Sequence, residues 1–245
     1  MSTGAWAAAA GAVGQMASLD VSTNNLVNAS TPGFRADSSI FRQVLVNAVS
    51  GNTATKSLHY LTTRTTAPDM GVGQIVPTGR PLDVAIPDDK GFFVISTPRG
   101  DRYTRAGNFK LRVDGTLTTS DGFPVLAENR RPLVLGATGA NVAINAEGRV
   151  TSDGQPGPKL AIVTFANLAA LQKVEGVALR APPEAGPAVA HEVALETGAL
   201  ELSNESSVSG MADEVNTSRQ FDMTMKVIEA FTAIDKSAAK DIMGK

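Results

Sequence analysis

Apolar residues recur at alternating spacings of four and three at both ends of the chain, whereas the middle follows a different pattern. This heptad-type spacing is typical of a helix that packs along another helix. It predicts an N-terminal helix over about residues 4–29, whose only charge is Asp20. Three glycines inside this helix each cost about 1 kcal/mol relative to alanine, so we expect it to need a partner helix. The N-terminal series is Ala5, Ala9, Ala12, Met16, Leu19, Thr23 and Leu26.

A longer series with the same spacing occupies the C-terminal end, from about Ser206 to Met243, with no proline and a single internal glycine, Gly210. We call each of these two apolar series a ladder. A helix of this span would be about 55 Å long. That length exceeds what a compact domain usually buries and indicates a coiled coil. Its first members are Val208, Met211, Val215, Ser218, Phe221, Met225 and Ile228.

The middle of the chain carries short alternating runs typical of β-strands. Between them stand the turn-forming dipeptides Asp114-Gly115, Asp121-Gly122, Glu147-Gly148 and Asp153-Gly154, which favour hairpins. This pattern predicts an all-β sandwich or barrel-like body. The runs are residues 82–86, 91–97, 108–113 and 159–165.

We therefore expect an α+β fold in which helices at the two ends form a coiled-coil module and an all-β body is inserted between them. The expected parts are an N-terminal axial helix and turn (1–35), an extended linker region (36–80), a β body (81–203) and a C-terminal axial helix (204–245).

Dense turn signals follow the first helix. Asn24, Asn25 and Asn28 are poor helix formers that tolerate left-handed geometry, and Pro32 disfavours helix at the residue before it. Gly33 then permits a sharp turn before Phe34. We expect this turn to serve assembly and to contribute little to the stability of the monomer.

Composition and charge exclude several classes of function. The net charge of −2 gives no strong field for nucleic acid or an anionic membrane, and no apolar run is long enough to insert into a bilayer. Cysteine is absent, which excludes disulfides and thiolate metal sites. The first basic residue is Arg35, so a signal peptide with a basic n-region is not expected.

No constellation of residues indicates catalysis, a cofactor or a metal. His59 and His191 lie far apart in the sequence, and neither accompanies a nucleophile motif. The tripeptide Arg99-Gly100-Asp101 matches a known adhesion motif but is expected to be a hairpin turn. We therefore expect a structural subunit and no enzyme, with a secreted β-rich adhesin as the main rival and a β-barrel enzyme as a weaker one.

Three ordered motifs resemble those of the bacterial flagellar rod and hook proteins. The segment NNLVNASTPGFR (24–35) resembles their N-terminal signature, and GRPLDVAIPDDKGFFVI (79–95) with YTRAGNF (103–109) resembles their β-domain core. Ser203-Asn204, Arg219, Phe221 and the run 225–228 are similar to their last helix.

The resemblance implies a subunit of the rod, the drive shaft that crosses the periplasm between the membrane ring and the hook. It implies export through the flagellar type III apparatus without cleavage, and assembly with other rod proteins and with copies of itself. The Arg80–Ala85 run and residues 218–228 are most similar to the proximal-rod branch of the family, with the distal rod as the alternative.

Combined with the ladders, the resemblance predicts an assembly interface made by the two helices and the turn. Its expected members are Ala12, Met16, Leu19, Asn24, Asn25, Leu26, Asn28, Pro32, Gly33, Phe34, Met211, Val215, Arg219, Phe221, Met225 and Ile228.

Overall fold

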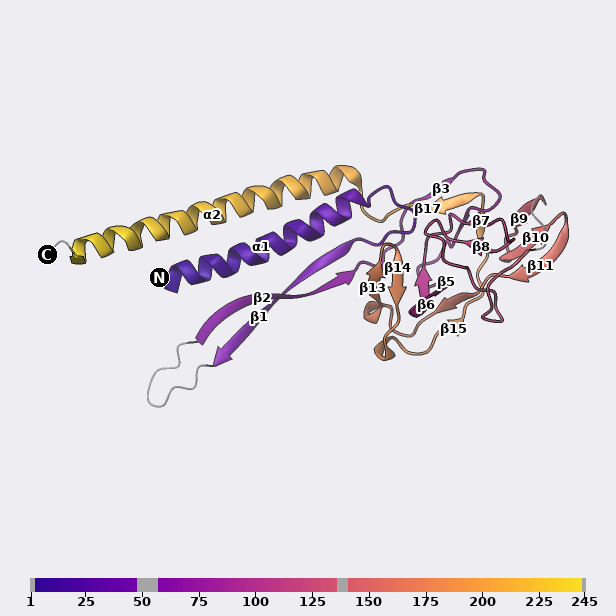
Figure 1. Cartoon of the computed structure of the whole chain (residues 1–245), viewed down its shortest axis with the longest axis horizontal. Helices are drawn as coiled ribbons and strands as arrows, with labels where there is room; N and C mark the ends of the chain where they lie inside the picture. The colour runs from indigo at the N-terminus through magenta and orange to yellow at the C-terminus, as the bar shows by residue number, and fades with distance from the viewer. Residues whose placement is uncertain (1–2, 48–56, 136–140, 244–245) are drawn as a thin grey trace. The chain divides into compact units, whose positions relative to one another are not determined.

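The computed structural model describes residues 3–47, 57–135 and 141–243 of the chain, which divides into two compact units, a helical unit and a β body (Figure 1). The chain passes between these two units four times. The helical unit comprises Met1–Val27, Asp37–Ala67 and Ser207–Lys245, and the β body comprises Asn28–Ala36 and Pro68–Ser206.

The helical unit contains the two terminal helices expected from the ladders. Helix α1 (Thr3–Val27) and helix α2 (Ser207–Met243) lie side by side and run in opposite directions (Figure 1). Helices at both ends of the chain are thus confirmed, while their winding into a coiled coil remains a prediction. Neither described helix is apolar enough over a sufficient length to cross a membrane.

The helical unit also holds a long two-stranded sheet, formed by β1 (Asp37–Asn47) and β2 (Ser57–Pro68), and β1 contacts α1. The sequence suggested an extended linker over residues 36–80. The structure places β1 and β2 in the helical unit, whereas β3 (Ile75–Pro77) belongs to the β body. The linker therefore contributes strands to both units, because β1 and β2 pair with each other and β3 pairs with a strand from the far end of the chain.

The β body is built from short, mostly antiparallel strands. Its largest sheet has six strands in the order β13-β14-β6-β5-β12-β15. The strands of this sheet are β5 (Phe92–Thr97), β6 (Gly100–Thr104), β12 (Ile162–Thr164), β13 (Gln172–Glu175), β14 (Ala178–Arg180) and β15 (Val189–Ala190). The smaller sheets contain β4 (Val84–Ala85), β7 (Lys110–Leu111), β8 (Leu117–Thr118), β9 (Val142–Ile144), β10 (Arg149–Ser152), β11 (Gln155–Lys159), β16 (Glu196–Thr197) and β17 (Ala199–Glu201).

Strand β5 explains the continuous apolar run of residues 91–95. Successive side chains of a strand point to opposite faces of its sheet. Phe93 and Ile95 accordingly lie in one buried cluster, whereas Phe92 and Val94 lie in the other. Both faces of the six-stranded sheet are therefore covered, and a strand buried on both faces has no polar alternation.

The hairpin and turn predictions within the body are confirmed. The glycines of the four turn dipeptides, Gly115, Gly122, Gly148 and Gly154, all have positive φ angles. Strands β5 and β6 form a hairpin whose closing pair is Thr97 and Gly100. The Arg99-Gly100-Asp101 tripeptide lies in this hairpin, and its two charged side chains are paired within the chain, with Glu175 at 2.8 Å and Arg130 at 3.3 Å.

Candidate assembly site

One row of side chains on α2 faces α1. Within the row, Glu214 accepts hydrogen bonds from the hydroxyls of Ser22 and Thr23 on α1, each at 2.9 Å. Because the residues of the row recur at spacings of three and four, they lie on one side of the helix. The half-buried members are Glu214, Thr217, Phe221, Thr224, Ile228 and Phe231.

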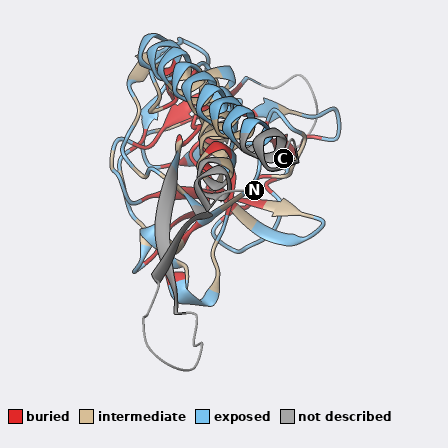
Figure 2. Cartoon of the chain, turned by 90° about the vertical axis from the view of Figure 1, so that its left-hand side faces the viewer, coloured by how far each residue is buried: buried red, intermediate tan, exposed pale blue. Residues whose placement is uncertain are grey.

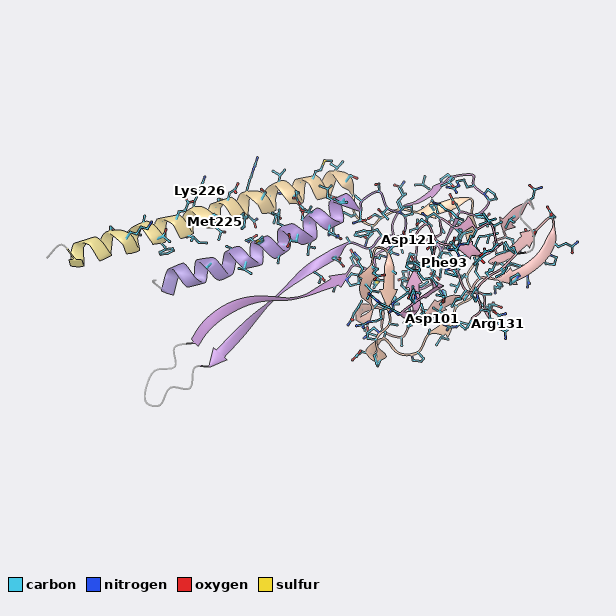
Figure 3. The ribbon with its side chains drawn as sticks, in the orientation of Figure 1. Phe93, Asp101, Asp121, Arg131, Met225 and Lys226 are labelled. Atoms are coloured by element: carbon cyan, nitrogen blue, oxygen red, sulfur yellow. The ribbon has the colours of Figure 1, made fainter. Side chains whose placement is uncertain are left out.

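A second row on α2 is mostly exposed and runs from Met211 through Val215, Ser218 and Asp222 to Met225. Met211, Val215 and Met225 are 58%, 49% and 39% exposed, and exposed surface follows much of α2 in Figure 2. Met225 and its exposed neighbour in the sequence, Lys226, are labelled on α2 in Figure 3. The single seam expected on α2 is therefore divided: Phe221 and Ile228 belong to the row that faces α1 and Ser218 is half-buried, whereas the remaining members are exposed, namely Val208, Met211, Val215, Arg219 and Met225.

Helix α1 divides in the same way. Ala12 is buried and Leu19 and Leu26 are half-buried, whereas Met16 is 57% exposed. Exposed Val13 and Val27 are further apolar residues of this helix. Both helices thus carry large apolar side chains that their pairing within the chain leaves uncovered.

The end of α1 is fixed to the start of β1 by the buried side chain of Asn25. Its amide nitrogen donates to the backbone oxygen of Asp37 at 2.9 Å, and its amide oxygen accepts from the backbone N–H of Asp37, also at 2.9 Å. Asn24 is exposed and Asn28 is half-buried. Of the three asparagines expected in the turn, Asn25 therefore acts inside the helical unit.

The turn after α1 packs into the β body. Asn28 accepts from the backbone N–H of Thr31 at 3.0 Å, and the backbone N–H of Gly33 donates to the backbone oxygen of Glu201 at 2.8 Å. Gly33 has a φ of +68°, and a Cβ atom placed on it would lie 2.2 Å from the backbone nitrogen of Ala106. The expectation that this turn contributes little to monomer stability is therefore wrong, because the turn is part of the packed body.

Phe34 anchors the turn after Gly33. Its ring is 1% exposed, and the ammonium of Lys173 lies 3.8 Å from the ring centroid, which is a favourable cation–π arrangement. Lys173 also donates to the backbone oxygen of Arg35 at 2.6 Å. The next backbone N–H, that of Ala36, donates to the side chain of Asn204 at 2.7 Å.

A buried carboxylate, that of Glu201, joins this turn to the rest of the body. It lies 2.7 Å from the guanidinium of Arg35 and 3.0 Å from that of Arg105, and all three side chains are at most 2% exposed. The contacts to the two guanidiniums have ion-pair distances, although the contacting N–H groups are not aligned for hydrogen bonds. Glu201 also accepts from the backbone N–H of Gly73 at 3.0 Å. We call these four residues the Glu201 clamp.

Arg105 extends the clamp toward the surface of the body. It donates to the backbone oxygens of Gly91 and Asp88, and the carboxylate of Asp88 contacts the ring of His191. Burial lowers the pKa of the Arg105 guanidinium, Glu201 opposes this decrease and nearby Arg35 adds to it. An arginine remains protonated at neutral pH even so, so the clamp holds two positive charges.

The Asp88 carboxylate makes the stability of the β body depend on pH. Burial raises its pKa, but hydrogen bonds from His191 and from the backbone N–H groups of Gly91 and Lys90 outweigh this, so the pKa lies below the ordinary 3.8. A folded-state pKa below the unfolded value means that the contribution is present above about pH 4 and is lost as the pH falls through the folded pKa. We expect the stability of Asp88→Asn to fall less steeply below pH 4 than that of the wild type, as measured by urea unfolding between pH 7 and pH 2.5. Equal slopes would show that Asp88 does not contribute.

Sequence reasoning missed Glu201 and Glu214. Glu201 stands in the apolar run Ala199-Leu200-Glu201-Leu202, and a lone acid in such a strand signals a buried ion pair. Glu214 gives a weaker signal, because an acid on a long helix is more often solvated.

Two antiparallel terminal helices, a β body and three ordered sequence motifs define the class of protein. Residues 86–152 match the family model described as the flagellar hook protein FlgE/F/G D1 domain. This match indicates a protein of the bacterial flagellum.

Comparison with individual proteins narrows this class. The chain is 33% identical to the flagellar basal-body rod protein FlgF of Salmonella typhimurium and 34% identical to that of Escherichia coli, in each case over 90% of this chain and 89% of the relative. It is 32% identical to the rod protein FlgG of Bacillus subtilis over 86% of this chain and 88% of that relative. The chain belongs to the family of flagellar basal-body rod proteins.

Proposed function

We propose that this chain is a FlgF-like structural subunit of the proximal rod of the bacterial flagellum, which polymerises through its terminal helices. Its place is the basal-body rod, and the FlgF proteins of Salmonella and E. coli support the FlgF-like assignment. The polymerisation step is supported by the exposed apolar side chains in the second row of α2, those of Met211, Val215 and Met225. Apolar side chains left uncovered in the monomer are typical of an interface with another subunit.

The proposed partners follow from this place in the rod. They are copies of the chain itself, the proximal-rod proteins FlgB and FlgC, the distal-rod protein FlgG and the flagellar type III export apparatus. A distal-rod role is the second candidate, because the B. subtilis FlgG is nearly as similar to the chain as the FlgF proteins are.

The structural role is supported by the relatives. The named relatives are rod proteins. Among the residues whose side chains the structure describes, histidine, aspartate and glutamate do not form a group of three that could hold a metal ion. The His191–Asp88 pair lies beside the buried Arg105 of the clamp, and a structural contact accounts for it.

Locating the subunit within purified basal bodies tests the proposal. An epitope can be inserted at Asp121-Gly122, where a Cβ on Gly122 would meet open space. We expect the label on the membrane-proximal part of the rod in electron micrographs, and no label in cells that carry the untagged chain. Label next to the hook would favour the distal rod, and label on the cell surface without basal bodies would favour the adhesin.

A further inference from the structure

The Glu201 clamp joins the places where the chain enters and leaves the β body. The chain crosses between the units at both ends of the segment Asn28–Ala36, before Pro68 and after Ser206. Arg35 belongs to the first segment, Gly73 follows the third crossing, and Glu201 precedes the fourth. The carboxylate of Glu201 contacts Arg35 and the backbone N–H of Gly73, and its backbone oxygen accepts from Gly33.

Backbone contacts join the same segments as this carboxylate. Glu201 pairs with Ile75 in the β17–β3 ladder. Asn204 donates to the backbone oxygen of Asp69 at 3.0 Å and accepts from Ala36. The segments around residues 69–75 and 201–204 are therefore held by strand pairing as well as by side chains, and we expect them to stay together without the carboxylate.

The two arginines depend on Glu201 to different degrees. Arg105 has further acceptors in the backbone oxygens of Gly91 and Asp88, in addition to the carboxylate of Asp88 at 3.6 Å. Among the residues that the structure describes, Arg35 forms its ion pair with Glu201. Loss of the carboxylate would leave Arg35 as a buried charge without compensation, which is strongly unfavourable.

We propose that Glu201 is the positioning residue that holds the turn Asn28–Ala36 in the β body. Without its charge, Arg35 moves to solvent and takes this turn with it, while the six-stranded sheet stays folded. In the rod subunit inferred above, on which this functional consequence rests, Glu201 thereby fixes the turn that follows the N-terminal helix in the chain.

Amide hydrogen exchange of the full-length monomer tests this proposal. In Glu201→Gln we expect the amides of Gly33 and Ala36 to exchange roughly 100-fold faster or more, the effect of an uncompensated buried charge. The amides of Val94 and Leu126 in the body should keep their protection, since they donate to Ala161 and Val94 across the core. Glu196→Gln is the matched control, because Glu196 is an exposed acid in the neighbouring strand β16, and its exchange should equal that of the wild type.

A second substitution separates charge from shape. Glu201→Gln alone leaves the positive charge of Arg35 buried without a partner. Adding Arg35→Met removes this charge, so the double variant should recover most of the protection at Gly33. Unchanged exchange at Gly33 in Glu201→Gln would overturn the proposal. So would equal loss of protection throughout the body, or failure of the double variant to recover. Because all these measurements use the monomer, their outcome does not depend on whether the chain enters the rod.

Discussion

Met225→Asp is expected to abolish entry of the chain into the rod while leaving the monomer folded. Met225 is 39% exposed and lies outside the half-buried row of α2, so an aspartate there stays partly solvated in the monomer. In the polymer the same carboxylate would be buried in an apolar interface, which costs several kcal/mol without a partner. Recovery of the variant in purified basal bodies and swimming of the cells measure assembly. Circular dichroism of the monomer measures folding.

Phe221→Asp provides the contrasting variant from the same helix. Phe221 lies in the half-buried row with Glu214 and Ile228, so its replacement should loosen the α1–α2 pair in the monomer and lower helical content. Lys226→Asp is the matched control, because Lys226 is exposed beside Met225 and a surface charge there changes stability by only tenths of a kcal/mol. Normal rods built from Met225→Asp would show that the exposed row is not the interface.

The division of each helix into two faces could not be read from the apolar pattern. Heptad spacing predicted both helices, but the row of α2 that faces α1 contains Thr217 and Thr224 as well as Glu214. Hydrogen bonds from Ser22 and Thr23 offset the cost of placing Glu214 there. A sequence shows which residues are apolar, whereas the choice between rows depends on contacts with residues about 190 positions away.

The turn after α1 shows a second limit of sequence reasoning. Asn28, Pro32 and Gly33 correctly predicted a sharp turn, because their preferences are local. The packing of this turn depends on Ala106 and Glu201, whose proximity to Gly33 follows from the folded body. Local signals therefore gave the geometry of the segment, and its placement required the tertiary structure.

Gly33→Val is expected to destabilise the β body strongly, in addition to any effect on assembly. A φ of +68° is strained for a β-branched residue, at a cost of about 1–3 kcal/mol. The new Cβ would lie 2.2 Å from the nitrogen of Ala106 and 2.6 Å from its Cα. These are backbone atoms that cannot swing aside, so overpacking adds about 1–3 kcal/mol or more. The turn would then leave its place, and the anchoring of Phe34 would be lost with it.

Gly79→Val separates these two costs. Gly79 has a φ of +71°, but a Cβ on it would meet nothing within 4 Å, so the control carries backbone strain without the clash. With a shift of about 2–4 °C per kcal/mol, we expect the melting temperature to fall by about 10 °C in Gly33→Val and by less than half of that in Gly79→Val. Calorimetry of the purified monomers measures both. Equal melting temperatures for the two variants would mean that Gly33→Val costs only backbone strain. The packing of the turn against Ala106 would then contribute nothing to the stability of the body.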